Sequence, residues 1–449
     1  MYTASHGITW HAHRITWHEV VLMATSVTTA GPFDIPLDVP PGADPDRALP
    51  ADLSDPTRTG AALGVLVESG RLDPPLSAAG STAARWRVLA DLAVNDVTLA
   101  RLAAGHAGAV AILNDLDGPV PRRDQRWGVW DIDTPVSPLA ARWGPDGWTL
   151  HGARPACSGA RVLTHALVAA EITTAEAGEA RQLFAVRLDD RGIAVAAGGR
   201  ASRAMAGADT ATVLFDGARA VAVGGPAETS GRSATAATAY SDRPVFWHAA
   251  AGVAACWFGG AIGVARPLFA AGRLDRTDHE GRSGYEGRSD HEGRSDHEDW
   301  TVHHGSVSGS ANRYGATGRG GPGGHHWFAD RRGRPLDARA LVHLGRVDAL
   351  LMAGRCVLET AAREIDADPG DTGGSARRRA LQVRAAVETC ATEVIDLVGR
   401  ALGPGPLCSD RGYARRVADL GFHLRHSHVE HDLETLANAV LDDLDPFWW

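Results

Sequence analysis

The sequence predicts an α+β fold built from a helical N-terminal domain, a β-barrel middle domain and a C-terminal four-helix bundle. From Thr82 to about Leu116 the apolar residues recur at three- and four-residue steps, which is typical of packed helices. From about Trp127 to Val223 short apolar runs alternate with Asp-Gly or Gly turns, which is typical of a small antiparallel barrel. From Pro244 onward the helical pattern returns, in long segments near 244–275, 337–366, 375–402 and 411–441.

The chain has 449 residues, enough for two or three structural units. We expect an N-terminal extension over 1–30, the helical domain over 31–125, the β-barrel domain over 126–225 and the bundle over 240–449.

A low-complexity insertion over 278–330 interrupts the predicted bundle. Six-residue repeats begin at Glu280, Glu286 and Glu292, and few apolar residues accompany them. The histidines of this insertion could bind a metal ion. Binding would then have to offset the conformational entropy lost when the whole segment becomes ordered around the metal. A solvated surface segment is therefore favoured, and no metal site is predicted.

Composition excludes several classes of function. All 45 basic residues are arginine, so no lysine is present for a Schiff base or for a P-loop. The net charge of −9 disfavours a surface that coats nucleic acid.

Residue usage also predicts the cellular compartment. Five widely spaced cysteines contain no CxxC pair, which fits a reducing compartment. No apolar run reaches 18 residues, and Ala249 to Ala265 is interpreted as a buried helix, so no membrane span is expected. Residues 1–25 lack the apolar core of a signal peptide. We expect a cytoplasmic protein.

Two stretches in the predicted β region carry chemistry. The first is a strand-turn-strand pattern, Gly-Trp-Thr-Leu-His-Gly-Ala-Arg-Pro-Ala-Cys-Ser-Gly-Ala, from Gly147 to Ala160. The second is Trp-Gly-Val-Trp-Asp from Trp127 to Asp131. Loops of this kind can offer backbone amides to a planar cofactor from rigid elements.

Two further stretches lie in the predicted bundle. The helix from Trp247 to Ala271 contains a cluster of glycines and leads into Arg-Leu-Asp-Arg-Thr, which ends at Thr277. The other runs from Gly-Pro-Gly-Pro-Leu at Gly403 to Arg-Arg-Val-Ala-Asp at Asp419. Small residues along such a helix allow close packing, and glycines allow a backbone to approach a ligand.

Together with the helical stretch from Val88 to Leu102, these segments resemble the acyl-CoA dehydrogenase superfamily of flavoproteins. The resemblance covers about Leu76 to Leu441, apart from the insertion. It implies an FAD cofactor, a homodimer or homotetramer, and a small-molecule substrate that could be a CoA thioester. It also implies the cofactor-binding positions: Trp130 in the first flavin loop, Ser158 near the reactive N5 of the flavin, Arg276 at the pyrophosphate from the facing subunit, and Gly403 and Gly405 against the dinucleotide.

The usual catalytic base of that superfamily is missing. Counting from Asp419 places Ser427 where the family has a glutamate, and no acidic residue lies between Pro244 and Leu274. Histidine can act as a base near neutral pH. The candidate catalytic residues are therefore His426 and His423, which would share one helix face, with Glu430 placed to orient His426.

Three functions remain open from the sequence. The first is an FAD-dependent oxidoreductase that transfers hydride from a CH–CH group of an acyl-type substrate to the flavin. The second is a two-component flavin monooxygenase of the same fold. His426 and the Cys157-Ser158-Gly159 turn favour this function. The third is a catalytically degenerate scaffold or subunit. The electron acceptor, or a flavin reductase partner, is not specified by the sequence.

Overall fold

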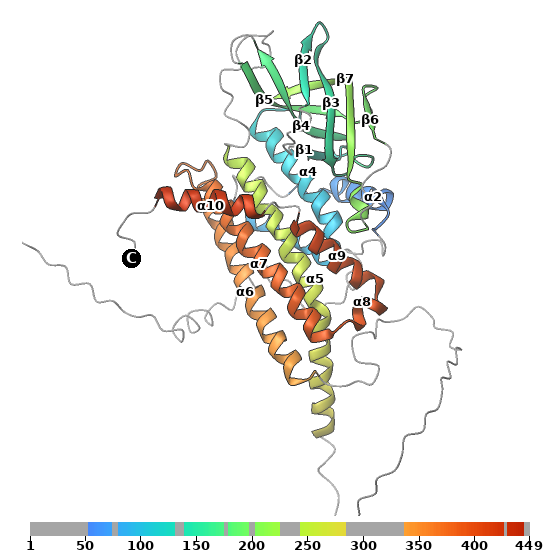
Figure 1. Ribbon diagram of the computed structural model, residues 1–449, viewed down its shortest axis with the longest axis vertical. Helices are drawn as coiled ribbons and strands as arrows, with labels where there is room; N and C mark the ends of the chain where they lie inside the picture. The colour runs from blue at the N-terminus through green and yellow to red at the C-terminus, as the bar shows by residue number, and fades with distance from the viewer. Residues whose placement is uncertain are drawn as a thin grey trace, which may run out of the picture.

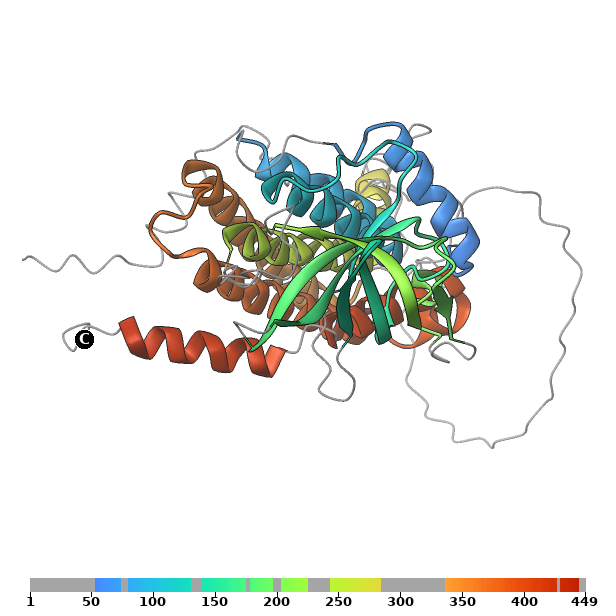
Figure 2. The same ribbon diagram turned by 90° about the horizontal axis from the view of Figure 1, so that it is seen from above.

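The computed structural model describes residues 53–73, 80–130, 139–174, 178–196, 203–224, 243–283, 336–425 and 429–443. A group of strands lies above a bundle of long helices, and one helix runs from the strands down into the bundle (Figure 1). Seen from above, the strands lie across the near face with the helices behind them (Figure 2).

Three helices precede the strands. They are α2 (Pro56–Glu68), α3 (Thr82–Asn95) and α4 (Val97–Asp115). Asp96 lies between α3 and α4 with extended backbone, and its carboxylate accepts a hydrogen bond from the Leu99 N–H at 2.8 Å. This residue therefore ends one helix and caps the N-terminus of the next, which fixes a sharp angle between them.

Seven strands follow in the middle of the chain. They are β1 (Trp127–Trp130), β2 (Ala140–Gly144), β3 (Gly147–Cys157), β4 (His165–Thr174), β5 (Gly178–Arg187), β6 (Ile193–Val195) and β7 (Ala211–Val223). The pairings run β4 to β2, β2 to β3, β3 to β7, β7 to β5 and β5 back to β4, which closes a ring. Strand β1 pairs in parallel with the first half of β4. Strand β2 pairs with the second half of β4, on the same edge.

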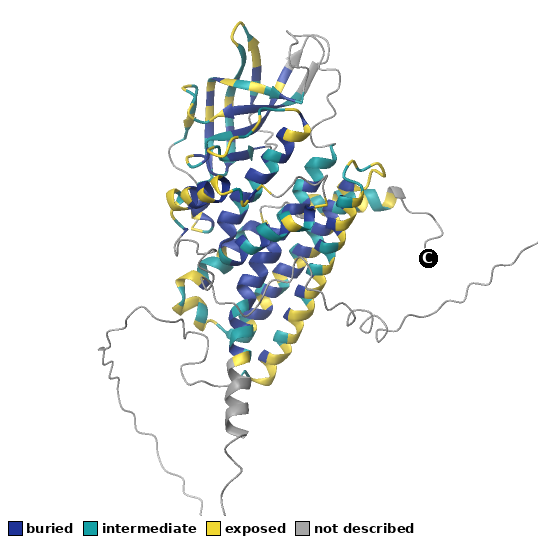
Figure 3. Ribbon diagram, turned by 180° about the vertical axis from the view of Figure 1, so that it is seen from behind, coloured by how far each residue is buried: buried dark blue, intermediate teal, exposed yellow. Residues whose placement is uncertain are grey.

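The second helical part contains α5 (Pro244–Ser283), α6 (Ala338–Ala367), α7 (Ala376–Leu402), α8 (Gly405–Ser409), α9 (Arg411–Arg425) and α10 (Val429–Asp443). Helix α5 is central and contacts α3, α4, α6, α7 and α9. Its middle part, residues 251–265, is almost wholly buried, whereas α6 exposes its outer face (Figure 3). The predicted segment 411–441 is two helices, α9 and α10, and most of the low-complexity insertion lies outside the described residues.

Small residues let α3 and α5 approach closely. A Cβ added at Gly259 would lie 2.1 Å from the Ala90 carbonyl oxygen, and one at Gly263 would lie 2.4 Å from that of Val94. No side chain fits at either position, so the glycines of α5 are needed for helix packing.

Two helices are long and apolar enough to cross a membrane by length and composition, the 97–115 helix and the first 30 residues of α5. Two-thirds of each apolar window is buried inside the protein. Buried core helices pass the same test, and the burial of α5 agrees with the sequence-based interpretation of that segment.

Candidate functional site

A small cleft lies where α4, β1 and the end of β3 meet. Its volume is about 50 Å³. Helix α4, strand β1 and the end of β3 line it, with these residues: Arg101, Leu102, Gly105, Trp127, Gly128, Val129, Trp130, Arg154, Pro155, Ala156, Ser158 and Leu163. The two β-region stretches that the sequence identified separately thus share one cleft.

The end of β3 is irregular where it borders this cleft. The pairing register with β7 shifts between Arg154 and Cys157, which marks a bulge. Within the bulge Ala156 has φ +58°, in the left-handed region that residues with a Cβ rarely adopt. Strained backbone of this kind concentrates at functional sites, where the surrounding structure holds it in place.

Trp130 connects β1 to the turn after β3. Its ring is 4% exposed, and its indole N–H donates a hydrogen bond to the Ser158 carbonyl oxygen at 3.0 Å. The Ser158 hydroxyl lies 3.3 Å from the hydroxyl of Thr210. The structure therefore brings together the two predicted site residues Trp130 and Ser158, and it joins them by a direct bond.

His106 on α4 fixes the first residue of β1. Its Nδ1 accepts a hydrogen bond from the Trp127 N–H at 3.2 Å, and burial lowers the pKa of His106 to about 4. A neutral imidazole is required for this bond, because only the neutral ring has an acceptor nitrogen. On its outer side the Trp127 ring stacks on His165 at 4.6 Å between ring centroids.

Two arginines give the cleft a positive charge. Arg154 is 5% exposed and donates to the Ala169 carbonyl oxygen. Arg101 projects from α4, and burial lowers its pKa, with the nearby Arg384 acting in the same direction and Cys256 opposing it. No acidic residue is among those lining the cleft in the described part of the chain.

Arg101 was not among the residues predicted from the sequence. The available signal was a charged residue between the apolar Leu99 and Leu102 in a helix that is otherwise apolar there. Such a pattern does not distinguish an arginine that reaches solvent from one that faces a cleft.

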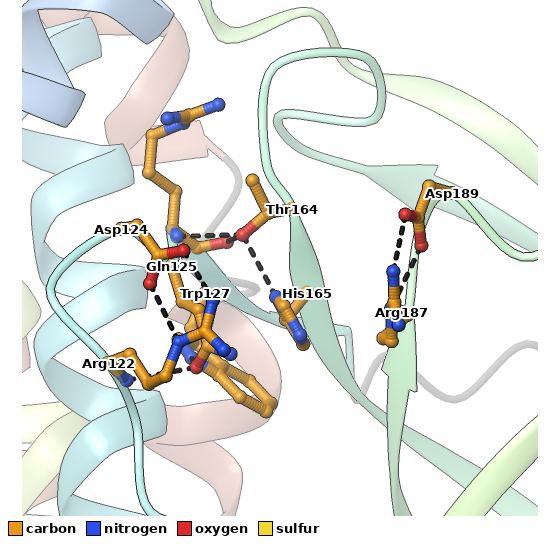
Figure 4. A network of polar contacts seen from close by, with 9 residues as sticks. Arg122, Asp124, Gln125, Trp127, Thr164, His165, Arg187 and Asp189 are labelled. Atoms are coloured by element: carbon orange, nitrogen blue, oxygen red, sulfur yellow. Dashed lines mark hydrogen bonds and ion pairs between the residues drawn. The ribbon is translucent and has the colours of Figure 1, made fainter.

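A larger groove of about 650 Å³ adjoins the cleft across Leu163. Figure 4 shows its polar contacts: Arg122 pairs with Asp124 at 2.5 Å, and Arg187 pairs with Asp189 at 2.7 Å. The hydrogen bond from each arginine lowers the pKa of its aspartate. Each pair combines one positive and one negative charge, so the two pairs make the groove polar but add no net charge to it.

The predicted catalytic histidines do not line the cleft in the described structure. His423 on α9 is 3% exposed and meets the Trp257 ring edge-to-face at 6.0 Å. His426 lies outside the described residues, as does the side chain of Arg276 within α5. The proposed orientation of His426 by Glu430 stays a prediction.

Gly403 and Gly405 lie at the junction of α7 and α8. Gly403 caps α7 with φ +66°, and no atom lies within 4 Å of a Cβ added at either glycine. The positive φ explains the glycine at 403 as a helix end. The open surroundings leave the predicted approach of a ligand untested.

The charged residues that follow these glycines bind within the protein. Arg415 pairs with Asp96 at 2.5 Å, and Arg416 donates to the Gly263 carbonyl oxygen at 3.4 Å. The carboxylate of Asp419 accepts a hydrogen bond from the Met205 N–H at 2.6 Å. This segment joins α9 to α4, α5 and the β part of the chain.

No family model and no curated protein matches this sequence. Solved structures do match. TdsC from Paenibacillus sp. A11-2, solved with FMN and indole, has a TM-score of 0.59 at 17% identity, covering 88% of this chain and 98% of its own. KijD3, solved with FMN and a dTDP-linked amino sugar, has a TM-score of 0.60 at 15% identity, covering 87% and 89%.

A third solved structure, titled a steroid ACAD variant of Tcur3481-Tcur3483, gives a TM-score of 0.52 at 17% identity. It covers 85% of this chain and 89% of its own. ACAD abbreviates acyl-CoA dehydrogenase, the superfamily that the sequence motifs resemble. These likenesses span most of each chain, and they agree with the order of helices, strands and helices described above. The chain has the fold of the acyl-CoA dehydrogenase superfamily.

Proposed function

We propose that this protein is a flavin-dependent oxidoreductase and that its flavin binds at the cleft between α4, β1 and the end of β3. The observation that carries the proposal is the meeting of Trp130 and Ser158 in one cleft of this fold. Rigid backbone and an aromatic wall suit the polar edge of a flavin ring. When bound, the flavin would supply the electron transfer that no protein side chain provides.

The cleft would take only part of the flavin. Cofactor and ligand pockets usually have volumes of about 300–1,000 Å³, whereas this cleft has about 50 Å³. We therefore propose that Trp130 and Ser158 would border one edge of the flavin without enclosing it. Trp130 holds the two walls together, and the neutral His106 holds β1 in place.

Of the possible reactions, we favour oxygenation by a two-component flavin monooxygenase. Abstraction of a proton next to a thioester needs a base, and no carboxylate lines the described cleft. His423, the described candidate base, contacts Trp257 instead. TdsC is titled a dibenzothiophene monooxygenase, which supports the same choice.

The proposed reaction uses reduced flavin delivered by a separate reductase, together with molecular oxygen. When bound, the reduced flavin would supply the two electrons of this reaction, in which one oxygen atom would enter the substrate and the other would leave as water. The protein's own residues bind and orient the flavin and the substrate and exclude water from the cleft. Dehydrogenation of an acyl-type substrate, with hydride passing to tightly held FAD, is the competing reaction.

Anaerobic flavin binding tests the proposal. The purified protein is titrated with oxidised and reduced FMN and FAD, and each dissociation constant is measured by fluorescence or absorbance. We expect reduced flavin to bind at least as tightly as oxidised flavin. Failure to bind any of the four forms would contradict a flavin enzyme and favour the scaffold role.

A second measurement separates the two reactions. Oxidised flavin bound to the protein is mixed anaerobically with octanoyl-CoA as a test thioester. A dehydrogenase would bleach the flavin, whereas the monooxygenase proposed here would not. In the converse experiment, the protein loaded with reduced flavin is exposed to oxygen, and we expect slower release of hydrogen peroxide than from free reduced flavin.

The identity of the flavin is part of the proposal. The resemblance in sequence implies FAD, whereas two of the solved structures above are titled as FMN complexes. Arg276→Ala should weaken FAD binding by about 1.5–3 kcal/mol and leave FMN binding nearly unchanged if Arg276 contacts the pyrophosphate. Equal loss of both flavins would contradict that role.

A further inference from the structure

Three arginines of the helical part are paired with carboxylates, whereas Arg101 in the cleft is not paired with one among the described residues. Arg415 pairs with Asp96, Arg384 with Asp432 at 2.9 Å, and Arg379 with Glu364 at 2.9 Å. For Arg101 the described part of the chain provides no carboxylate partner and no hydrogen-bond acceptor.

The surroundings of Arg101 do not compensate its charge. The nearest titratable groups are the thiol of Cys256 and the guanidinium of Arg384. Burial raises the pKa of Cys256 to about 12, so this thiol is neutral at physiological pH. Arg384 carries a like charge, and its own partner Asp432 takes up its Nε and one terminal nitrogen. Arg101 is partly exposed and lines the cleft, so its guanidinium is available to pair with an anionic ligand that enters there.

The cleft around Arg101 has the character of a receptor for an anion. Apolar and aromatic groups form its walls, among them Leu102, Trp127 and Trp130, and the second charge is the cation of Arg154. A guanidinium donates two parallel hydrogen bonds to a planar oxyanion, which matches a carboxylate. The volume of about 50 Å³ suits one small charged group rather than a large ligand.

We propose that Arg101 binds the carboxylate of the substrate, and that the substrate class is an aromatic or otherwise apolar carboxylic acid. This inference rests on the proposed function, because it assigns the substrate of the same cleft. The carboxylate pairs with Arg101, and the apolar body lies against the tryptophans. Arg101 is thus a substrate-binding residue that sets specificity for anions.

Ligand binding tests this inference without turnover. Benzoate, phenylacetate and indole-3-acetate serve as probes, and their neutral amides serve as matched ligands. Binding to the purified full chain is measured by calorimetry. We expect at least one acid to bind at least tenfold more tightly than its amide, and Arg101→Gln to abolish that preference.

Two variants control this experiment. Arg400→Gln removes a surface arginine, 65% exposed in its side chain and paired with Asp396, and it should bind the acids as the wild type does. Arg101→Lys keeps the charge without the two-pronged donor and should bind more weakly than wild type but better than Arg101→Gln. Equal affinity for the acids in wild type and Arg101→Gln would overturn the inference, as would the absence of binding by all three acids to wild type.

Stability of the ligand-free protein distinguishes a binding role from a structural one. Arg101→Met should leave the melting temperature within a few degrees of wild type, because it removes a partly exposed cation that has no carboxylate partner in the described part of the chain. Arg415→Met should lower it, because Asp96 then lacks its partner. A fall in both variants would mean that Arg101 supports the fold.

Flavin binding separates the failure of this inference from that of the proposed function. Arg101→Gln should bind FMN within about twofold of wild type if its partner is the substrate. A tenfold loss of FMN affinity with unchanged binding of the acids would assign Arg101 to the flavin and overturn the inference while supporting a flavin enzyme. Acid binding in a protein that binds no flavin would support the anion site and contradict the proposed function.

Discussion

The backbone N–H of Met205 donates a hydrogen bond to Asp419 at 2.6 Å, from a left-handed residue with φ +51°. The other oxygen of the same carboxylate lies 3.3 Å from the hydroxyl of Thr98, which donates to it. One buried aspartate therefore joins α9 to α4 and to the segment between β6 and β7. It fixes the relative position of three parts of the chain that are far apart in sequence.

Asp419→Ala should destabilise the protein by about 1.5–3 kcal/mol, because it leaves the Met205 N–H buried without an acceptor. Asp419→Asn should cost less, since its amide oxygen can still accept that bond and its NH₂ can donate to Thr98. Urea unfolding at pH 7 measures both. Equal losses for the two variants would contradict a role based on the hydrogen bond.

The same aspartate predicts a pH dependence. Burial raises the pKa of Asp419, so the folded state holds its proton to a higher pH than the unfolded state does. Its contribution to stability is fully present below pH ~4 and is lost as pH rises through the raised pKa. Asp419→Asn should flatten this part of the stability profile, and an unchanged profile would rule the assignment out.

The ion pair of Arg415 with Asp96 should respond asymmetrically to mutation. Arg415→Met leaves a nearly fully buried carboxylate unpaired and should cost about 3–5 kcal/mol. Asp96→Asn keeps the cap on α4 and leaves an arginine whose side chain is 25% exposed, so it should cost less. Urea unfolding of each variant and of the double variant checks this order, and equal losses for the two single variants would contradict it.

His106 should make the protein sensitive to acid. Its pKa of about 4 in the folded state lies below the unfolded value of ~6.5, so the unfolded state binds the proton first. The contribution of neutral His106 to the free energy of unfolding is therefore fully present above pH ~6.5. It falls by up to about 3 kcal/mol as the pH drops toward 4.

His106→Phe tests that origin. The variant should lose stability at neutral pH, because the Trp127 N–H loses its acceptor, and should show a flatter profile between pH ~4 and ~6.5. His431→Gln, at an exposed histidine of α10, serves as the control and should leave the profile unchanged. A wild-type slope that persists in His106→Phe would place the acid sensitivity elsewhere.

Trp130→Phe should weaken flavin binding severalfold. It removes the N–H that donates to the Ser158 carbonyl oxygen, a bond worth about 1 kcal/mol, and so loosens the two walls of the cleft. Trp143→Phe is the matched control, because Trp143 is 48% exposed on β2, meets Trp148 edge-to-face and is not among the residues that line the cleft. Titration with FMN compares the two, and similar dissociation constants would show that the bond does not shape the site.

The large elements could be predicted from the sequence because periodicity is a local property. The long helices begin near the expected residues. The stretch from Gly147 to Ala160, predicted as strand-turn-strand, holds one continuous strand, β3, which ends at Cys157. The break between α9 and α10 was missed, because the polar run from His423 to Glu430 fits a helix face as well as a helix end.

The site was predicted only in part. Trp130 and Ser158 were identified from short motifs and do share the cleft. The bond between them, the role of Asp419 and the isolation of Arg101 depend on contacts between distant segments, as in the pair Thr98 and Asp419. No pattern in one sequence encodes which partner a buried charge finds or fails to find.

The closed ring of strands protects this protein from pairing with other chains. Free strand edges recruit further strands and promote aggregation. Here β4 is covered on one edge by β5 and on the other by β1 and β2, while α4 packs against β1. Strand β6, with three residues, is short for an edge that could recruit another strand. In the described part of the chain, the arrangement that builds the cleft therefore also leaves little strand backbone open to another chain.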